Sequence, residues 1–447
     1  MTSRTTADLV VKARWILPVE PAGRVFENHA VVVTGGRIVA ITPCAALSEY
    51  PAREVMDRPD HVLIPGLVNA HTHAAMTLFR GIGGGHNVDD WLRQLIWPLE
   101  SRLVDADFIA DGTELAIAEM LLGGVTCFAD MYFHPDVTAQ VAARSGIRAC
   151  IGLPVLEQPT GWAQGLDEYL ERSLELRDRY RSDPLIDTCF AVHSPSLTQD
   201  STLSRLRTLA DQLQSLVMIH LLESPSERAR ETRRHGRGPL ERLESAGLVN
   251  DLLLAVHCVQ ADTAEIGRLS LAGASIVHCP ASNLKLASGI APVPEMIDAG
   301  LNVALGTDGA ASNDSLDVLG EARLAALLAA GVTGRPNAIT PAMALEMATL
   351  AGARALGIAE TTGSLASGKW ADIACLKLAG PRADPVLDVA ASILNAAGRS
   401  AVTDVWVAGR PLVTDGRLSR IDVTALGERA RRWGTRVLAA RASLAGQ

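Results

Sequence analysis

Between residues 63 and 359, short apolar runs alternate with longer stretches whose apolar residues recur at helical spacing. This alternation is typical of repeated βα units that form a parallel sheet. Eight runs are predicted as strands: Leu67–His73, Val125–Asp130, Arg148–Leu153, Ile186–His193, Val217–His220, Leu253–His257, Ser275–His278 and Asn302–Asp308. Eight such units over roughly 300 residues predict an α/β fold of the (β/α)8 TIM-barrel type.

Helices are expected between these strands, and two of them, over residues 105–122 and 341–356, are followed by a glycine suited to a helix end. An open doubly wound sheet is the alternative fold, but its first strand usually leads into a glycine-rich phosphate-binding turn. Here the first strand ends in His71-Thr72-His73 instead. The barrel is therefore the favoured prediction.

The two ends of the chain carry shorter apolar runs. Strand candidates are Leu9–Lys12, Ala30–Thr34, Arg37–Ile41, Asp372–Leu376, Val402–Val407 and Arg410–Thr414, with the hairpin signal Gly35-Gly36 between the second and third. Strands this short cannot bury a face alone, so the two ends are expected to form one small β-sandwich domain. We expect residues 1–62 and 360–447 in this domain, with a C-terminal helix over about 423–440, and residues 63–359 in the barrel.

The composition excludes several classes of protein. The 447 residues are 48% hydrophobic and only 4% aromatic, which suits a large α/β core, and the net charge of −9 includes no long basic run for nucleic acid. Seven cysteines without a C-x-x-C pair indicate reduced residues of a cytoplasmic protein. The first apolar run, Leu9–Val11, is cut by Lys12 and Arg14, so we expect neither a signal peptide nor a membrane span.

Histidines gather at the ends of the predicted strands. Six of the eleven lie there, namely His71, His73, His193, His220, His257 and His278, and Asp308 ends the eighth strand. In a TIM barrel these ends all meet at the catalytic face. His71, His73, His220 and Asp308 supply three nitrogen ligands and one oxygen ligand, which suits one Zn²⁺ per chain with a position left for water. Fe²⁺ or Mn²⁺ also bind such sites.

Three residues are candidates for proton chemistry beside this metal. Glu223 follows His220 by three residues and is the candidate general acid and base. Asp308 can take the proton of the attacking water, and His257 can hydrogen-bond the nucleophile or the oxygen that forms on the substrate. Because zinc lowers the pKa of bound water to about 7, the set supports hydrolytic attack on an electron-poor trigonal carbon.

Each of these residues alone has an ordinary structural interpretation. One buried histidine at a strand end is more often a hydrogen-bonded core residue, and short motifs give false matches. Their joint occurrence in barrel order favours the metal site. His278 stays open, because it precedes Cys279-Pro280 and can equally serve to orient that loop.

The same residues carry a family resemblance. The chain resembles the amidohydrolase superfamily, in its mononuclear-metal deaminase and chlorohydrolase branch. The resemblance rests on the stretch Pro65–His73, on His220 with Glu223, on His257 and on Gly306-Thr307-Asp308. The resemblance covers nearly the whole chain. It implies the barrel, the metal and the roles given above, and it makes a homo-oligomer the expected state.

Finer motifs are similar to one subgroup, the 5'-methylthioadenosine/S-adenosylhomocysteine deaminases. They are the stretches 91–100, Asp130–His134, His193-Ser194-Pro195 and Pro280–Leu286. In that subgroup the glutamate matching Glu100 binds the ribose hydroxyls, and the histidine matching His193 contacts the nucleoside. Trp97 and Glu223 are expected beside them in the substrate site. A carboxylate suits a vicinal diol because it accepts two hydrogen bonds, although a lone glutamate is more often simply exposed.

One departure from the subgroup bears on the substrate. Members that accept S-adenosylhomocysteine are expected to carry arginines after the third strand for the amino-acid carboxylate, but residues 149–170 contain no Arg or Lys. The first hypothesis is therefore a deaminase that converts 5'-methylthioadenosine to 5'-methylthioinosine, with adenosine or S-adenosylhomocysteine as weaker substrates. Water would attack C6 of the adenine, Glu223 would protonate the ring nitrogen, and ammonia would leave with a proton from Asp308.

Two alternatives stay open. The same metal site can act on a free base or a triazine, as in guanine or cytosine deaminases and chlorohydrolases, and Glu100 would then have no ribose diol to hold. A non-catalytic barrel that only binds a ligand is the third hypothesis. Loss of a metal ligand or of Glu223 would indicate it, and neither is missing from the sequence.

Overall fold

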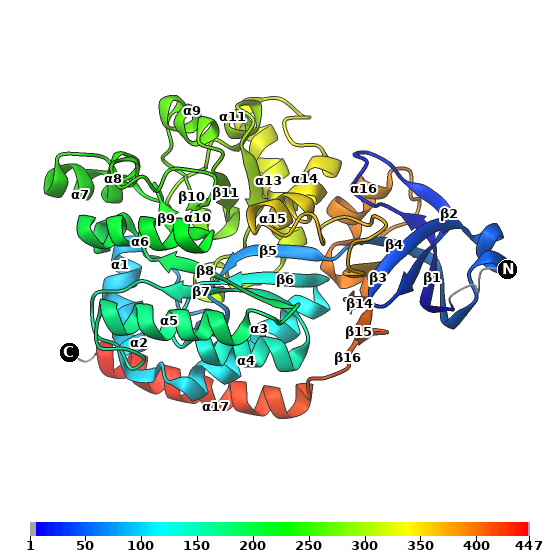
Figure 1. Ribbon diagram of the computed structural model, residues 1–447, viewed down its shortest axis with the longest axis horizontal. Helices are drawn as coiled ribbons and strands as arrows, with labels where there is room; N and C mark the ends of the chain where they lie inside the picture. The colour runs from blue at the N-terminus through cyan, green and yellow to red at the C-terminus, as the bar shows by residue number, and fades with distance from the viewer. Residues whose placement is uncertain (1–5, 446–447) are drawn as a thin grey trace. The chain divides into compact units, whose positions relative to one another are not determined.

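The computed structural model describes residues 6–445 (Figure 1). The expectation that the N-terminal segment is not a signal peptide concerns in part Met1–Thr5, which lie outside the described residues. Two compact units can be distinguished. One comprises Met1–Asn69, Ala118–Cys127 and Asp317–Ile421, and the other comprises Ala70–Ile117, Phe128–Leu316 and Asp422–Gln447. The domain boundaries expected from the sequence stay a prediction.

Eight strands form a parallel sheet in which every strand neighbours the next one along the chain, from β5 to β12. They are β5 (Leu67–Thr72), β6 (Val125–Asp130), β7 (Arg148–Pro154), β8 (Ile186–Val192), β9 (Val217–Leu221), β10 (Leu253–His257), β11 (Ser275–His278) and β12 (Asn302–Leu305). Beyond β12, the N–H of Asp308 donates to the carbonyl of His71 in β5, N to O 3.1 Å, which brings the last strand to the first. The predicted (β/α)8 TIM barrel is confirmed.

The predicted strands begin at the observed residues, and seven of the eight end within one residue of the prediction. The exception is the eighth, because β12 ends at Leu305 rather than at Asp308. At the next residue, Gly306, a Cβ atom would lie 2.9 Å from both the backbone nitrogen and the Cβ of His71. Only glycine fits this approach, and Asp308 then follows with a positive φ of 59°.

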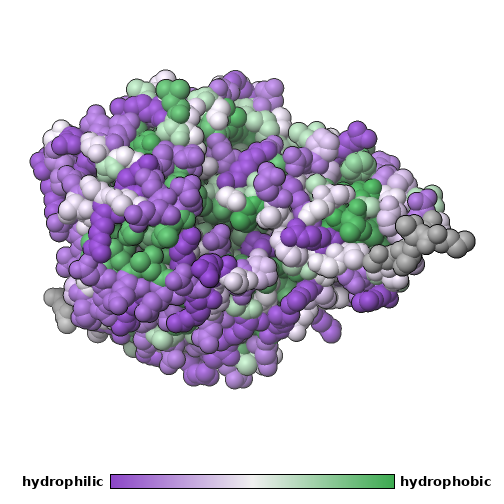
Figure 2. All heavy atoms as spheres, in the orientation of Figure 1, coloured by the Kyte–Doolittle hydropathy of each residue, from purple (hydrophilic) through white to green (hydrophobic). Residues whose placement is uncertain are grey.

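Helices connect the strands. They are η1 (Cys44–Glu49), η2 (Ala74–Phe79), α1 (Val88–Asp90), η3 (Trp91–Ile96), α2 (Trp97–Leu103), α3 (Ala106–Leu122), α4 (Pro135–Ser145), α5 (Leu166–Tyr180), η4 (Pro195–Leu197), α6 (Asp200–Leu213), α7 (Pro225–His235), α8 (Pro239–Ser245), α9 (Thr263–Leu271), α10 (Pro280–Lys285), α11 (Val293–Asp298), α12 (Ala310–Asn313), α13 (Val318–Thr333), α14 (Pro341–Met347), α15 (Leu350–Ala355), α16 (Val389–Ala391), η5 (Ser392–Ala397), η6 (Arg399–Ala401) and α17 (Val423–Ala445). In α5, Tyr169, Leu170 and Leu176 are buried, whereas its charged residues give the hydrophilic surface over this helix in Figure 2. Among residues 6–445, no helix combines the length and apolar character needed to cross a membrane.

Two predicted helices differ in detail from the structure. The single helix expected over residues 341–356 is two helices, α14 and α15, because Thr349 leaves helical geometry with φ −135° and ψ −89°. Its hydroxyl donates to the carbonyl of Leu345, Oγ1 to O 2.6 Å. The C-terminal helix was assigned from sequence to the β domain, but α17 groups with the unit that contains α2 and η2. Figure 1 shows it running along α2.

The remaining strands form a second sheet in the order β16-β15-β14-β13-β4-β1-β2-β3. They are β1 (Ala7–Ile16), β2 (Phe26–Thr34), β3 (Arg37–Pro43), β4 (Ala52–Pro65), β13 (Ile373–Lys377), β14 (Val402–Val407), β15 (Arg410–Thr414) and β16 (Arg417–Leu418). The predicted hairpin at Gly35-Gly36 is confirmed, with positive φ at both glycines. This sheet confirms the small β domain built from both chain ends.

The sequence did not predict β4, although this strand joins the two halves of the sheet. It pairs in parallel with β1 and antiparallel with β13. Its first ten residues are half-buried or exposed, and they include Arg53, Asp57, Arg58 and Pro59. A charged, proline-containing segment lacks the apolar alternation by which strands are recognised.

Candidate metal centre and active site

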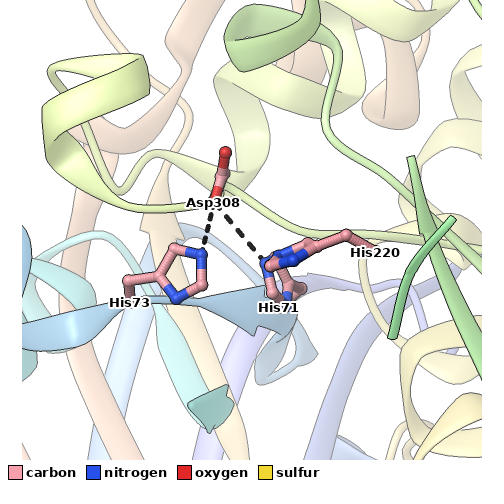
Figure 3. Close-up of side chains that lie close together, drawn as sticks. All are labelled: His71, His73, His220 and Asp308. Carbon is pink, nitrogen blue, oxygen red and sulfur yellow. Dashed lines mark hydrogen bonds and ion pairs between the residues drawn. The ribbon is translucent and has the colours of Figure 1, made fainter. Parts of the chain in front are cut away.

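Four side chains converge at the carboxyl ends of the barrel strands (Figure 3). His71 lies in β5, His73 follows β5 directly, His220 lies in β9, and Asp308 follows β12 by three residues. One ligand atom from each can be chosen so that all four lie within 4.8 Å of one another. The Nε2 atoms of His71 and His220 are 3.1 Å apart, and Oδ1 of Asp308 is 3.1 Å from Nε2 of His73 and 3.5 Å from Nε2 of His71.

The far sides of two ligand rings, those of His73 and His220, are held by backbone carbonyls. Nδ1 of His220 donates to the carbonyl of His193 at 2.6 Å, and Nδ1 of His73 donates to the carbonyl of Met131. In these tautomers Nε2 carries the free lone pair and faces the cluster. Such outer hydrogen bonds typically orient metal-binding histidines.

The carboxylate of Asp308 is fixed in the same manner. Its Oδ2 accepts hydrogen bonds from the hydroxyls of Ser282, at 2.6 Å, and Ser312, at 2.8 Å. Its Oδ1 is thereby directed toward the histidines. Burial would raise the pKa of Asp308, but contacts with His71 and His73 hold this pKa well below its usual value.

The protonation states of His71, His220 and Asp308 fit a divalent cation. Asp308, by contrast, raises the pKa of His73 to about 9 although burial opposes this, so a bound cation would displace the His73 proton. Burial lowers the pKa of His71 to about 4 and lowers that of His220 well below its usual value, so both rings are neutral near pH 7. Neutral imidazoles and an ionised carboxylate are the forms that bind metal. Three nitrogens with one oxygen match the ligand preferences of zinc and neighbouring transition metals. The four residues therefore form a metal-binding site.

A cavity of about 830 Å³, open solvent at its mouth included, adjoins this cluster. Eight of the candidate site residues line it: His73, Trp97, Glu100, His193, His220, Glu223, His257 and Asp308. The ninth, His71, is fully buried and is not part of the lining. The rest of the lining is mainly apolar and aromatic. This size and character are typical of a pocket for a small organic molecule.

Two candidates for proton transfer line the cavity near the cluster. Glu223 follows β9 by two residues, and burial raises the pKa of its carboxyl. His257 ends β10, and its Nδ1 donates to Oδ1 of Asn283 at 2.9 Å. The stacked rings of His257 and His220 have centroids 5.3 Å apart. His257 therefore lies against a metal ligand and is held in one orientation.

The candidate substrate residues come from separate elements. Glu100 lies in α2 and accepts a hydrogen bond from Tyr132, Oη to Oε1 2.7 Å. Burial raises the pKa of Glu100 to about 7, although the Tyr132 hydrogen bond opposes this. Trp97 lines the same cavity with 37% of its surface exposed. His193 follows β8, and its buried Nδ1 has no hydrogen-bond partner within residues 6–445.

The sequence assigned no role to several residues that the structure places in contact with the site. They are Tyr132, Ser282, Asn283 and Ser312. Tyr132 follows β6 by two residues, so the strand-end rule that located the histidines would also have found it. No comparable signal marks Ser312, which lies in α12. His278 is buried and is not one of the four clustered side chains, and burial lowers its pKa to about 3.

Comparison with known proteins agrees with this geometry. A model of the amidohydrolase family matches residues 62–412. The 5-methylthioadenosine/S-adenosylhomocysteine deaminase of Saccharophagus degradans is 41% identical over 444 residues, which are 99% of this chain and 100% of that protein. The 5'-deoxyadenosine deaminase of Methanosarcina mazei is 36% identical over 432 residues, which are 95% of this chain and 97% of that protein.

A solved structure is similar in both fold and sequence. The crystal structure of an adenosine deaminase from Xanthomonas campestris with bound zinc matches with a TM-score of 0.96 and 45% identity, covering 98% of this chain and 100% of that one. The resemblance inferred from the His71, His220 and Asp308 motifs is confirmed. The chain belongs to the amidohydrolase family.

Proposed function

We propose that this protein is a metal-dependent hydrolytic deaminase of adenine nucleosides, with 5'-methylthioadenosine as its preferred substrate and adenosine or S-adenosylhomocysteine as weaker ones. The observation that carries the proposal is one cavity lined by metal-binding side chains at one place and by the Glu100–Tyr132 pair at another. The names of the relatives support the reaction class. The product would be the 6-oxo, inosine-type nucleoside together with ammonia.

The residues around the metal site divide the proton chemistry. A bound Zn²⁺, one per chain, would lower the pKa of water and so supply the nucleophile at neutral pH, and Fe²⁺ or Mn²⁺ are alternatives. Asp308 accepts the proton released as the water oxygen bonds to C6. Glu223 donates its proton to the ring nitrogen next to C6, a role that its raised pKa favours. His257 hydrogen-bonds the new oxygen, and ammonia leaves with the proton from Asp308 as the C6–N bond breaks. The C6–OH proton goes to the Glu223 carboxylate, which restores its acid form and leaves the 6-oxo product.

The ribose end of the substrate would lie at Glu100. This carboxyl keeps Oε2 for the substrate because Tyr132 occupies Oε1. One carboxylate can accept hydrogen bonds from both hydroxyls of a vicinal diol. A free base or a triazine has no such diol, so the Glu100–Tyr132 pair favours a nucleoside over those alternatives. His193 and Trp97 would contact the nucleoside from the same cavity.

The 5' end of the substrate would meet an apolar surface. Among the described residues that line the cavity there is no lysine or arginine, whereas Phe133, Pro154 and Leu156 are present. A methylthio group suits these side chains. The amino-acid tail of S-adenosylhomocysteine would find no cationic partner there for its carboxylate. The cytoplasmic location and a homo-oligomeric state stay predictions.

The decisive experiment follows the loss of ultraviolet absorbance that accompanies removal of the 6-amino group. The purified protein is assayed with 5'-methylthioadenosine, adenosine, S-adenosylhomocysteine and free adenine. We expect kcat/KM to be highest for 5'-methylthioadenosine and lowest for adenine. A clear preference for S-adenosylhomocysteine would overturn the substrate assignment, and equal turnover of adenine would favour a base deaminase.

A further inference from the structure

One buried carboxyl next to the active site is not used by the proposed mechanism. Glu227 lies in the first turn of α7 and is 5% exposed. Its Oε2 accepts a hydrogen bond from the backbone N–H of Glu223 at 2.8 Å, and its carboxyl also interacts with the N–H of Leu222. The hydroxyl of Ser224, the N-cap of α7, accepts the N–H of Glu227 at 3.3 Å. This carboxyl therefore ties the start of α7 to the loop that carries Glu223.

The next βα unit contains a regular helix start for comparison. In α9, Oε2 of Glu265 accepts the N–H of the N-cap residue Asp262 at 3.0 Å, and Asp262 accepts the N–H of Glu265 at 2.9 Å. This is the regular capping box, in which the third helical residue bonds to the N-cap itself. In α7 the corresponding residue, Glu227, bonds to Glu223, one residue before the N-cap. The shift directs the bond to the residue that lines the cavity.

The loop that Glu227 holds has an unfavourable backbone conformation. Leu222 has a φ of +53°, in the left-handed region that a leucine rarely adopts. Such a conformation persists only where the surroundings enforce it. The carbonyl of Leu222 accepts the N–H of Gln260 at 2.8 Å, and the Glu227 carboxyl holds the N–H groups on the other side. The direction of the Glu223 side chain depends on this turn.

The chemical state of Glu227 fits a holding role. Burial raises its pKa to about 8, so the group is neutral near pH 7 and places no negative charge beside Glu223. Its Oε1 is buried and has no hydrogen-bond partner in the part of the chain that the structure describes. The feature that matters for Glu223 is then an acceptor oxygen at the correct distance.

We propose that Glu227 is a positioning residue, which fixes the loop after β9 so that Glu223 points into the cavity toward the reacting ring. This inference rests on the proposed role of Glu223 as acid and base. Glu227 touches neither substrate nor metal in this scheme. It acts through the backbone N–H of Glu223.

Three substitutions at Glu227 test whether its hydrogen-bond acceptor oxygen or its acidic proton matters for kcat. Glu227→Gln keeps the length and an acceptor oxygen, Glu227→Asp keeps the acid but is one methylene shorter, and Glu227→Met keeps neither. With 5'-methylthioadenosine, we expect Gln to retain kcat within about threefold. Asp and Met should lose kcat by about 100-fold, the scale of a misplacement of about 1 Å, with KM and bound metal little changed.

The matched control is Glu241→Met, which removes a carboxyl from the same position of α8, where its Oε2 accepts the N–H of the N-cap residue Gly238 at 3.0 Å, and should leave kcat unchanged. If Glu227→Met does not fold, the order of Gln above Asp decides the question. Equal loss in the Gln and Asp variants, or wild-type kcat in Met, would overturn the inference. Glu223→Gln completes the set. Retained activity there would overturn the proposed role of Glu223 itself, whereas an inactive Glu223→Gln beside a fully active Glu227→Met removes only the positioning role.

Discussion

The hydroxyl of Tyr132 donates a hydrogen bond to Glu100, Oη to Oε1 2.7 Å, and both residues line the same cavity. Tyr132 follows β6, whereas Glu100 lies in α2, so the contact joins a strand end to a helix 32 residues earlier in the chain. The bond leaves the other carboxyl oxygen for a ligand and fixes its direction. It is the feature by which this metal site would distinguish a ribonucleoside from a free base.

Removing this bond tests the assignment. In Tyr132→Phe, Glu100 loses a partner while the cavity keeps its shape. A hydrogen bond to a charged group typically contributes about 1.5–3 kcal/mol, so we expect KM for 5'-methylthioadenosine to rise by about tenfold or more, with a smaller effect on kcat. Steady-state kinetics on 5'-methylthioadenosine and its 2'-deoxy analogue measures this. The rise should be smaller for the deoxy analogue, and an equal rise for both would exclude the ribose as the group that is held.

Tyr169→Phe is the matched control for that variant. Tyr169 is buried and its hydroxyl contacts Thr160, and neither residue lines the cavity. The same atom is deleted from the same residue type. We expect KM within about twofold of the wild-type value.

Metal removal gives a second prediction. Treatment with a chelator should abolish deamination, and Zn²⁺ should restore it. Because a ligand that binds only the folded state stabilises it, by about 4 kcal/mol at a thousandfold excess over Kd, the metal-free protein should also melt at a lower temperature. Activity, bound metal per chain and thermal unfolding are measured together.

His220→Ala and His278→Ala provide the matching pair of variants. Each removes a buried histidine at a barrel strand end, but only His220 belongs to the ligand cluster. We expect His220→Ala to retain little metal and His278→Ala to retain about one equivalent. Loss of metal in both variants would mean that the cluster of four does not define the site.

The sequence located the metal ligands because barrel geometry makes one rule sufficient. A residue at the carboxyl end of a parallel strand faces the common site, so His71, His73 and His220 could be placed without knowledge of packing. Asp308 was placed correctly although its strand ends at Leu305, since the short loop after β12 returns to His71. Strand starts were predictable for a related reason, because buried parallel strands are continuous apolar runs.

The features that escaped prediction depend on contacts between distant segments. Ser282 holds Asp308 only because α10, 26 residues earlier in the chain, lies beside it. The bond from Tyr132 to Glu100 requires α2 to lie over the end of β6. β4 is charged along its first half and is recognisable as a strand only through its partners β1 and β13. None of these relationships leaves a periodic signal in the sequence.

The position of α17 leads to a third prediction. Trp433 is 4% exposed, packs edge-on against Phe108 with ring centroids 5.1 Å apart, and donates from Nε1 to Asp111 at 2.9 Å. It belongs to the same buried cluster as Ile96 and Leu99. Ile96 lines the cavity, and Leu99 directly precedes Glu100 in the chain. Trp433→Ala should cost about 3–5 kcal/mol of unfolding free energy and raise KM. Trp433→Phe should lose less of the free energy of unfolding, which urea denaturation measures. A change below about 1 kcal/mol in the alanine variant would contradict this packing role.

A fourth prediction concerns the β domain and its pH dependence. The fully buried carboxylate of Asp404 in β14 accepts two hydrogen bonds from Arg58 in β4, at 2.7 and 2.9 Å, and one from Thr403. Burial would raise the pKa of Asp404, but these bonds hold it below its usual value. The carboxyl therefore stabilises the folded state above its unfolded pKa of about 3.9, and this contribution is lost as the pH falls through the lower folded pKa.

Asp404→Asn should remove that dependence. Arg58 is partly exposed and keeps Asp415 as a partner, so the loss of its bonds to Asp404 should cost about 1–3 kcal/mol at pH 7. The variant should lose less further stability than the wild type on going from pH 5 to pH 3. The double variant Arg58→Met/Asp404→Leu should recover much of the loss, because neither charge is then buried. Urea unfolding at several pH values tests all three proteins. A single Asp404→Asn variant as stable as the wild type at pH 7 would show that the pair does not connect β4 and β14 energetically.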